Sequence, residues 1–385
     1  MVYSFGAHLL VLLAGAVMIR KHPKKFYILA TAILSLLSYF VIATENMDLF
    51  RYIRIMEYIR TMGFDWGMET YGPSNPLAFI FFYGISLFDN DAILPAVAVA
   101  ITYGFSFALL YKASKRLNAS TMDTYIALVF FMLNMNYCYV IDVVRIYMAF
   151  AIMAYFLYMD IVEKKHRIFC FVVYAALCYF HYAMMVFVIL RIILMITRKF
   201  KGVLAAIVSL LVPIVVFVAY KFVEGFSGES LLFSVANDKL LGYKDYTVFG
   251  VWQFAASMIR CALFVILCLL AFWLCSNWKY ELANKTLGDN SRESVMFVKR
   301  NSDLVMYTLY IVFTVFIFIT NYQFVLRVPY FAQIFMSFVL LLVMTRIKKI
   351  DYQYHSFVSV IIILESVAHL GYLLIYVYKN LTFAF

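Results

Sequence analysis

The chain has 385 residues, of which 66% are hydrophobic, 19% aromatic and only 14% charged. A soluble domain of this length cannot bury so much apolar surface, so the composition excludes a soluble globular protein and predicts an all-α, polytopic integral membrane protein. The formal net charge is +11, but Lys and Arg stand in short clusters between apolar runs. Such clusters are typical of orientation signals in a bilayer, which argues against a nucleic-acid-binding protein.

Apolar runs long enough to cross the hydrocarbon core follow one another along the chain. We expect spans at 2–19, 26–43, 92–111, 123–141, 146–162, 167–181, 183–197, 203–223, 253–275, 304–325, 328–345 and 356–377. The first of these lacks the basic start and the cleavage site of a signal peptide, so we expect it to be retained. The six Cys are scattered singly without a CxxC pair, which predicts neither a disulfide framework nor a zinc site.

The short apolar run 77–88 decides the topology. If it crossed the membrane fully, the basic clusters 112–116, 163–167 and 198–201 would all lie outside. As a re-entrant or interfacial helix it places all of them inside, which the bias of Lys and Arg toward the cytoplasm favours. The sequence therefore predicts about twelve spans plus this partial helix, with both termini outside.

The expected organisation is one helical membrane domain over residues 1–385. It carries outer segments at 44–91 and 224–252 and a cytoplasmic loop at 276–303.

The first outer segment begins with NMDLFRYIRIMEYIR, at residues 46–60. Asp48, Arg51 and Arg54 repeat every three residues, which puts them on one face of a helix. A guanidinium can grip two phosphate oxygens at once, so this face predicts a phosphate site. The alternative is an amphipathic surface helix whose cations only attract anionic headgroups.

Further ionisable residues are expected on the same side. Asp142 and Arg145 are one helical turn apart and form either part of the site or a local structural pair. Arg327 precedes Pro329, which suits the first turn of a helix, so we expect Arg327 at an electropositive helix start and regard it as the best phosphate ligand. His181 is either a general base or a hydrogen-bonded packing residue.

A few charges lie deeper in the spans and should face the bundle interior because a charge in lipid is costly. They are Arg191, Arg260, Glu365 and His369. Glu365 either neutralises Arg260 or Arg191, or lines a polar pocket together with His369.

Several short motifs occur in a fixed order over about residues 45–345. They are DxxRY (48–52), NPLAFIFFYGISLF (75–88), R-x-x-x-A (145–149), a helix-ending His (181), GYKDY (242–246) and R-x-P-Y-F (327–331). In this order they resemble the EpsG-like branch of the Wzy-type polymerases of bacterial surface polysaccharide (O-antigen, capsule or exopolysaccharide). Asn75 departs from the pattern, because many relatives carry an acidic residue there.

The resemblance implies a GT-C-like, metal-independent glycosyltransferase in the bacterial cytoplasmic membrane, with its active site facing outside. It would transfer a growing glycan from undecaprenyl diphosphate to a carrier-linked repeat unit, without a cofactor. The expected partners are the undecaprenyl-diphosphate-linked oligosaccharide and the bilayer, with a chain-length regulator as a further candidate.

This chemistry needs cations at the departing diphosphate and a base at the acceptor hydroxyl. The candidate diphosphate ligands are Arg51, Arg54, Arg145 and Arg327, the candidate bases are Asp48, Asp142 and His181, and the candidate substrate contacts are Lys244, Tyr246, Asn75 and His369.

Two other functions stay open. A transporter or flippase of lipid-linked glycan would need substrate groups at mid-membrane and paired repeats. A ligase resembling the O-antigen ligases would use the same carrier-diphosphate site, so the sequence does not separate it from a polymerase.

Overall fold

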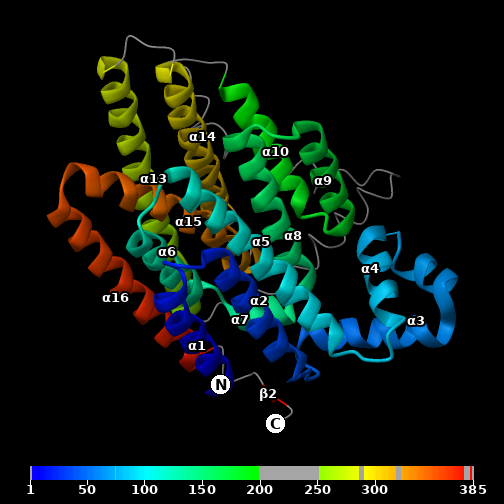
Figure 1. Ribbon diagram of the computed structural model, residues 1–385. Helices are drawn as coiled ribbons and strands as arrows, with labels where there is room; N and C mark the ends of the chain where they lie inside the picture. The colour runs from blue at the N-terminus through cyan, green and yellow to red at the C-terminus, as the bar shows by residue number, and fades with distance from the viewer. Residues whose placement is uncertain are drawn as a thin grey trace. The chain divides into compact units, whose positions relative to one another are not determined.

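The computed structural model describes residues 2–73, 75–198, 251–285, 290–317, 322–376 and 382–383, and nearly all of them are helical (Figure 1). Their contacts group the chain into two compact units, each assembled from segments that are far apart in the sequence. The first unit comprises Met1–Phe156, Ala175–His181 and Leu340–Phe385, and the second comprises Leu157–Tyr174 and Tyr182–Val339.

The first unit contains most of the N-terminal helices. They are α1 (Val2–Met18), α2 (Pro23–Tyr39), α3 (Asp48–Thr70), α4 (Pro76–Ser86), α5 (Ile93–Leu117), α6 (Thr121–Asn134) and α7 (Tyr137–Asp142), joined by α16 (Tyr352–Tyr376). Small side chains let α2 and α5 approach closely, as membrane helices often do. Ser35 Oγ donates to the carbonyl of Ala96 at 2.8 Å, and Ser38 Oγ donates to that of Pro95 at 3.2 Å.

Helices α3 and α4 leave the α1–α2–α5 group and fold against each other (Figure 1). The buried face of α3 includes Leu49, Tyr52, Met56 and Ile59, whose spacing of three and four residues is that of an amphipathic helix. Gly63 has φ 90° and kinks α3, a conformation that glycine adopts without a Cβ clash. The kink lets the second half of α3 return alongside α4.

The kinked end of α3 lies very close to α4. A Cβ atom on Gly67 would lie 2.5 Å from Cε2 of Phe79, so a larger side chain has no room there. Helix α4 has 11 residues, about half of what a membrane span needs. This length agrees with the expectation of a partial helix at 77–88.

The second unit is also helical. It contains the π-helix η1 (Met159–Glu163), α10 (Met184–Thr197), α13 (Val251–Lys285) and α14 (Asn290–Ile317). Helices α8 (Val144–Tyr158), α9 (Arg167–Phe180) and α15 (Tyr322–Ile350) contribute residues to both units. Helices α13 and α14 pack side by side as a long hairpin (Figure 1). Two short strands, β1 (Val41–Ile42) and β2 (Thr382–Phe383), pair antiparallel in the first unit.

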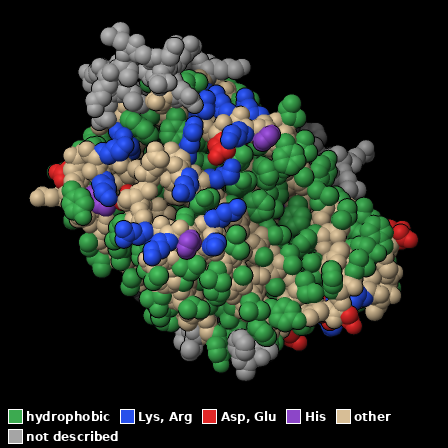
Figure 2. All heavy atoms as spheres, viewed as in Figure 1, with side chains coloured by type: hydrophobic (Ala, Val, Ile, Leu, Met, Phe, Trp, Pro, Cys, Tyr) green, Lys and Arg blue, Asp and Glu red, His purple; other side chains and the backbone are tan. Residues whose placement is uncertain are grey.

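Five helices in the described part of the chain are long and apolar enough to cross a membrane. They are Ile93–Leu117, Val144–Glu163, Phe254–Trp278, Arg327–Ile350 and Tyr352–Ile375. Hydrophobic side chains also cover much of the molecular face in Figure 2. On α16, for example, Phe357, Val360 and Leu364 are all exposed, which suits contact with lipid and not with water. The described part of the chain is therefore predominantly helical, with apolar helices long enough to cross a membrane.

The structure corrects two of the predicted boundaries. The span expected at 123–141 is interrupted, because Met135 is extended and Asn136 caps α7 by accepting a hydrogen bond from the Tyr139 N–H at 3.1 Å. The loop expected at 276–303 is wrong as a loop, because α13 continues to Lys285 and α14 begins at Asn290. The span expected at 203–223 lies outside the described residues.

Candidate functional site

Four of the predicted site residues meet where α3 begins. Asp48 and Arg51 form an ion pair at 3.2 Å. The Oδ1 atom of Asp142, the last residue of α7, accepts a hydrogen bond from the Leu49 N–H at 3.1 Å. Arg145 lies in the first turn of α8, and its guanidinium carbon lies 5.0 Å from the centre of the Tyr52 ring. We call Asp48, Arg51, Tyr52, Asp142 and Arg145 the α3 site.

The local sequence explains why α7 meets α3. The first N–H groups of any α-helix have no partner within the helix. Met47 precedes α3 and has no side-chain oxygen to cap it. The carboxylate of Asp142 supplies the missing acceptor, and its negative charge is favourable beside the electropositive end of a helix. Asp142 therefore has a structural role at the site.

Aromatic rings hold Arg145 in place. The Tyr52 ring stacks on Phe82 of α4 with centroids 5.1 Å apart and planes 22° apart, and Arg145 lies against Tyr52. A guanidinium over an aromatic face is stabilised by the charge distribution of the ring. Within the described part of the chain, the buried Nε of Arg145 has no hydrogen-bond partner. Its donor therefore remains available for an anion.

The α3 site can bind a phosphate and accept a proton. The Arg51 side chain is 69% exposed and that of Asp48 is 22% exposed, so both can reach a ligand. Forked guanidinium donors suit phosphate oxygens, and a carboxylate can act as a general base toward a hydroxyl. The arrangement thus combines the two kinds of group that transfer from a diphosphate requires.

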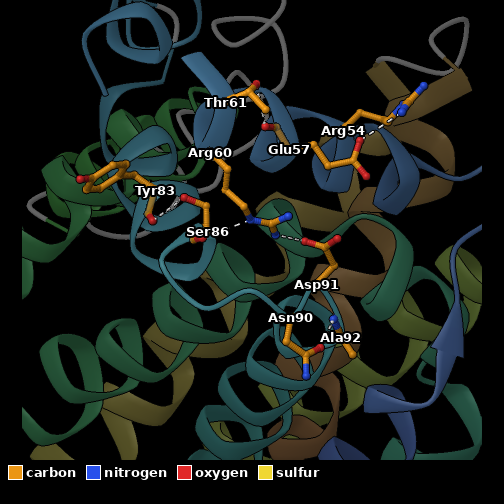
Figure 3. A network of polar contacts seen from close by, with 9 residues as sticks. All are labelled: Arg54, Glu57, Arg60, Thr61, Tyr83, Ser86, Asn90, Asp91 and Ala92. Atoms are coloured by element: carbon orange, nitrogen blue, oxygen red, sulfur yellow. Dashed lines mark hydrogen bonds and ion pairs between the residues drawn. The ribbon is translucent and has the colours of Figure 1, made fainter. Parts of the chain in front are cut away.

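Arg54 and Arg60 extend from α3 in different directions (Figure 3). Arg54 pairs at 3.1 Å with Glu57 one turn along on the exposed face. Arg60 instead binds the turn after α4, pairing with Asp91 and donating to the carbonyl of Ser86 at 3.2 Å. Arg60 thereby ties α3 to α4, and we did not anticipate its partner Asp91 from the sequence.

The Arg60–Asp91 pair should stabilise the packing of α3 on α4. We expect Asp91→Asn to lower the free energy of unfolding by up to about 1 kcal/mol, because both partners are partly exposed, and to speed hydrogen exchange in α4. The control is Glu57→Gln, which removes the same charge from the exposed Arg54 pair and should leave exchange in α4 unchanged. Equal effects of the two variants on hydrogen exchange in α4 would contradict the stabilising role of the Arg60–Asp91 pair.

Other predicted residues lie farther from the start of α3. Asn75 caps α4 by position, is 5% exposed, and has an Oδ1 atom without a hydrogen-bond partner among the described residues. His181 follows the end of α9 and is 8% exposed, and the neighbouring Phe180 ring contacts Phe81 of α4 at 5.8 Å. Both residues are therefore buried and not displayed on an open surface.

The expected position of Arg327 at a helix start is wrong. Helix α15 begins at Tyr322, and Pro329 lies inside it. Arg327 is therefore beyond the first turn, where the helix dipole attracts anions. Lys244 and Tyr246 lie outside the described residues. His369 lies on α16, where its ring contacts Tyr372 at 5.5 Å.

The buried charges also have partners that the sequence did not reveal. Arg191 pairs with Asp160, 2.6 Å away, and not with Glu365, which was one of the alternatives considered from the sequence. Glu365 instead accepts a hydrogen bond from the Asn134 amide at 3.1 Å. The sequence contains one indication that Asp160 has a buried partner. It is a single acidic residue inside an apolar run, about one helical turn before a basic cluster.

Among the described residues, no group of three or more His, Cys, Asp and Glu side chains is placed to hold a metal ion. Comparison of the chain with models of protein families, with curated proteins and with solved structures finds no match.

Proposed function

We propose that the protein is a polysaccharide polymerase of the bacterial cytoplasmic membrane. It transfers a growing glycan from undecaprenyl diphosphate to the sugar end of a carrier-linked repeat unit on the outer side. The observation that carries the proposal is the meeting of Asp48, Arg51, Asp142 and Arg145 at the start of α3. The motif order described above supports the same reaction.

The proposed chemistry assigns a role to each side chain of the α3 site. Arg51 and Arg145 bind the diphosphate and stabilise the negative charge that grows on it as the bond to the sugar breaks. Asp48 accepts the proton of the attacking hydroxyl, with His181 as the other candidate base. One oxygen of Asp142 already accepts from the Leu49 N–H, so Asp142 acts as a positioning residue. Arg54, Asn75, Arg327, Lys244, Tyr246 and His369 remain proposed contacts to carrier or sugar.

An assay with defined components tests the reaction. The purified protein in lipid nanodiscs is given only undecaprenyl-diphosphate-linked repeat units, and the products are separated by length. Longer glycans and released undecaprenyl diphosphate are the expected result. In sealed vesicles, movement of the repeat units between leaflets without lengthening would favour the transporter. Transfer only after a different acceptor lipid is added would favour the ligase.

The positioning role of Asp142 makes a separate prediction. An amide side chain at this position keeps an oxygen for the Leu49 N–H, so Asp142→Asn should retain chain growth to within about tenfold, a smaller loss than removal of a general base causes. Asp142→Ala removes the cap and should lower stability by about 1 kcal/mol. Growth rates and melting temperatures of the two variants check this. A dead but fully stable Asp142→Asn variant would make Asp142 the base.

A further inference from the structure

A second cluster of ionisable side chains lies within the second unit, apart from the α3 site. It comprises Asp160, Lys164, Arg167, Arg191, Arg198, Arg300 and Asp303, and we call it the Asp160 cluster. These residues come from η1 and the residue after it, the start of α9, the middle of α10 and the residue after its end, and α14.

Two carboxylates anchor the cluster. Asp160 is fully buried and binds two guanidiniums, with its Oδ2 atom 2.6 Å from Nε of Arg191 and its Oδ1 atom 3.1 Å from Nε of Arg167. Asp303 pairs with Arg198. Contacts of α14 with η1 and with α10 bring the two pairs together.

The backbone around Asp160 is irregular. Residues Met159–Glu163 form a π-helix, and Lys164 and His166 both have left-handed backbones, with φ of 54° and 50°. π-Helical turns are rare and occur often at functional sites, and left-handed non-glycine residues are uncommon. The irregular turn keeps Asp160 in the interior while Lys164 and Arg167 lie at the exposed rim.

The cluster carries more positive charge than its carboxylates can balance. The cluster holds five Lys and Arg side chains but only two carboxylates. Burial raises the pKa of Asp303 to about 6, although the charge of Arg198 opposes this shift. Burial and the guanidiniums of Arg300, Arg198 and Arg167 lower the pKa of Lys164. Like charges this close repel one another, so an additional anion would be favourable.

Two buried donors of the cluster lack an acceptor. Nη1 of Arg191 and Nε of Arg300 are buried and have no hydrogen-bond partner among the described residues. Arg191 is 0% exposed, so bulk water does not satisfy it. A buried charged donor without an acceptor is costly, whereas a phosphate offers several oxygens to forked donors.

We propose that the Asp160 cluster is a binding site for a phosphate group, held by Lys164, Arg167, Arg198 and Arg300 over the buried Asp160–Arg191 pair. The phosphate comes either from an anionic lipid headgroup or from a soluble phosphate. The charge bias of the chain predicts that the cluster faces the cytoplasm, whereas the proposed polymerase reaction takes place on the outer side. Phosphate binding here therefore does not depend on that activity.

Binding experiments on the full-length protein test the site with two probes. In neutral detergent, inorganic phosphate should raise the melting temperature of the wild type, or phosphatidylglycerol should remain bound in native mass spectrometry where phosphatidylcholine does not. The first result identifies a soluble phosphate as the ligand, and the second identifies a lipid headgroup. Failure of both probes to bind the wild type would overturn the proposal.

Charge variants localise the binding. Arg300→Gln should weaken binding about tenfold, since it removes a charged hydrogen bond, and Lys164→Gln should weaken it by a smaller factor. Lys164 is exposed, so its variant should fold normally. Asp303→Asn should strengthen binding, because it removes a competing negative charge. Lys349→Gln, at the exposed end of α15 outside the cluster, is the matched control and should bind like the wild type.

Two results with these variants would also overturn the proposal. One is wild-type affinity in both Lys164→Gln and Arg300→Gln. The other is an equal loss of affinity in Lys349→Gln, which would show that net charge alone attracts the probe.

Discussion

Replacing Arg51 by Ala should slow chain growth by roughly 100-fold or more, which is the usual loss when one donor to a developing negative charge is removed. The reason is that Arg51 is the most exposed cation of the α3 site and is held by Asp48 at 3.2 Å, where the proposed reaction places the diphosphate. Arg51→Lys should recover little, because an ammonium cannot form the forked contact. The initial rate of glycan lengthening with defined repeat units is the measurement.

The Arg51 variant should fold normally. An exposed ion pair within one helical turn contributes less than about 1 kcal/mol, so the melting temperature should be close to that of the wild type. Lys115→Ala removes an exposed cation from the last turn of α5 and serves as the matched control, with full activity expected. An Arg51→Ala variant that polymerises at the wild-type rate would contradict the proposed phosphate-binding role of Arg51.

The start of α3 shows how far the sequence alone could lead. The three-residue spacing of Asp48, Arg51 and Arg54 predicted a helix with one polar face, and the structure has both Arg side chains exposed there. Local periodicity carries such information because it depends only on the helix repeat. The sequence also predicted that Asp142 and Arg145 would lie near this helix.

The contacts that build the site could not be predicted. Asp142 caps α3 across 93 residues of sequence, and no local pattern specifies which distant carboxylate reaches a given helix start. Pro329 led to the wrong prediction that a helix begins near Arg327, because the effect of a proline also depends on groups that are distant in the sequence. A proline typically begins a helix in water, but a membrane helix tolerates one in its interior because neighbouring groups satisfy the freed carbonyl.

Buried pairs of ionisable side chains were the least predictable feature. Asp123 of α6 and His355 of α16 are both buried and are hydrogen-bonded at 2.7 Å, although neither attracted notice in the sequence. A single acid in an apolar run can face lipid headgroups, a substrate or a partner on another helix, and only the packing decides among these. Asp160 is the case with the largest energetic consequence.

Replacing Asp160 by Asn should destabilise the protein by about 3–5 kcal/mol, the usual cost of leaving one member of a buried ion pair without its partner. The carboxylate of Asp160 is 0% exposed, and it lies 2.6 Å from Arg191, whose side chain is 1% exposed. Loss of the negative charge leaves the Arg191 guanidinium buried without compensation. Unfolding of the purified protein by titration with a denaturing detergent measures the change.

The effect should be asymmetric between the two partners. Arg191→Met leaves Asp160 paired with Arg167 at 3.1 Å, and the Arg167 side chain is 46% exposed, so this variant should be less destabilised than Asp160→Asn. Replacing both residues, as Asp160→Leu with Arg191→Met, removes both buried charges and should restore most of the stability. Glu163→Gln, which breaks only the 3.9 Å pair with exposed Lys165, should change stability by less than about 1 kcal/mol.

These variants show whether the loss of stability in Asp160→Asn comes from the buried charge of Arg191 or from altered packing. If the double variant were as unstable as Asp160→Asn, the shape of the Asp160 side chain and not its charge would hold η1 against α10. If Asp160→Asn were as stable to the denaturing detergent as the wild type, another group would have to neutralise Arg191. Recovery in the double variant would instead show that the Asp160–Arg191 pair costs the fold about as much as it contributes, so that its retention needs a reason other than stability. The phosphate site proposed at the rim, where cations outnumber carboxylates, would supply such a reason.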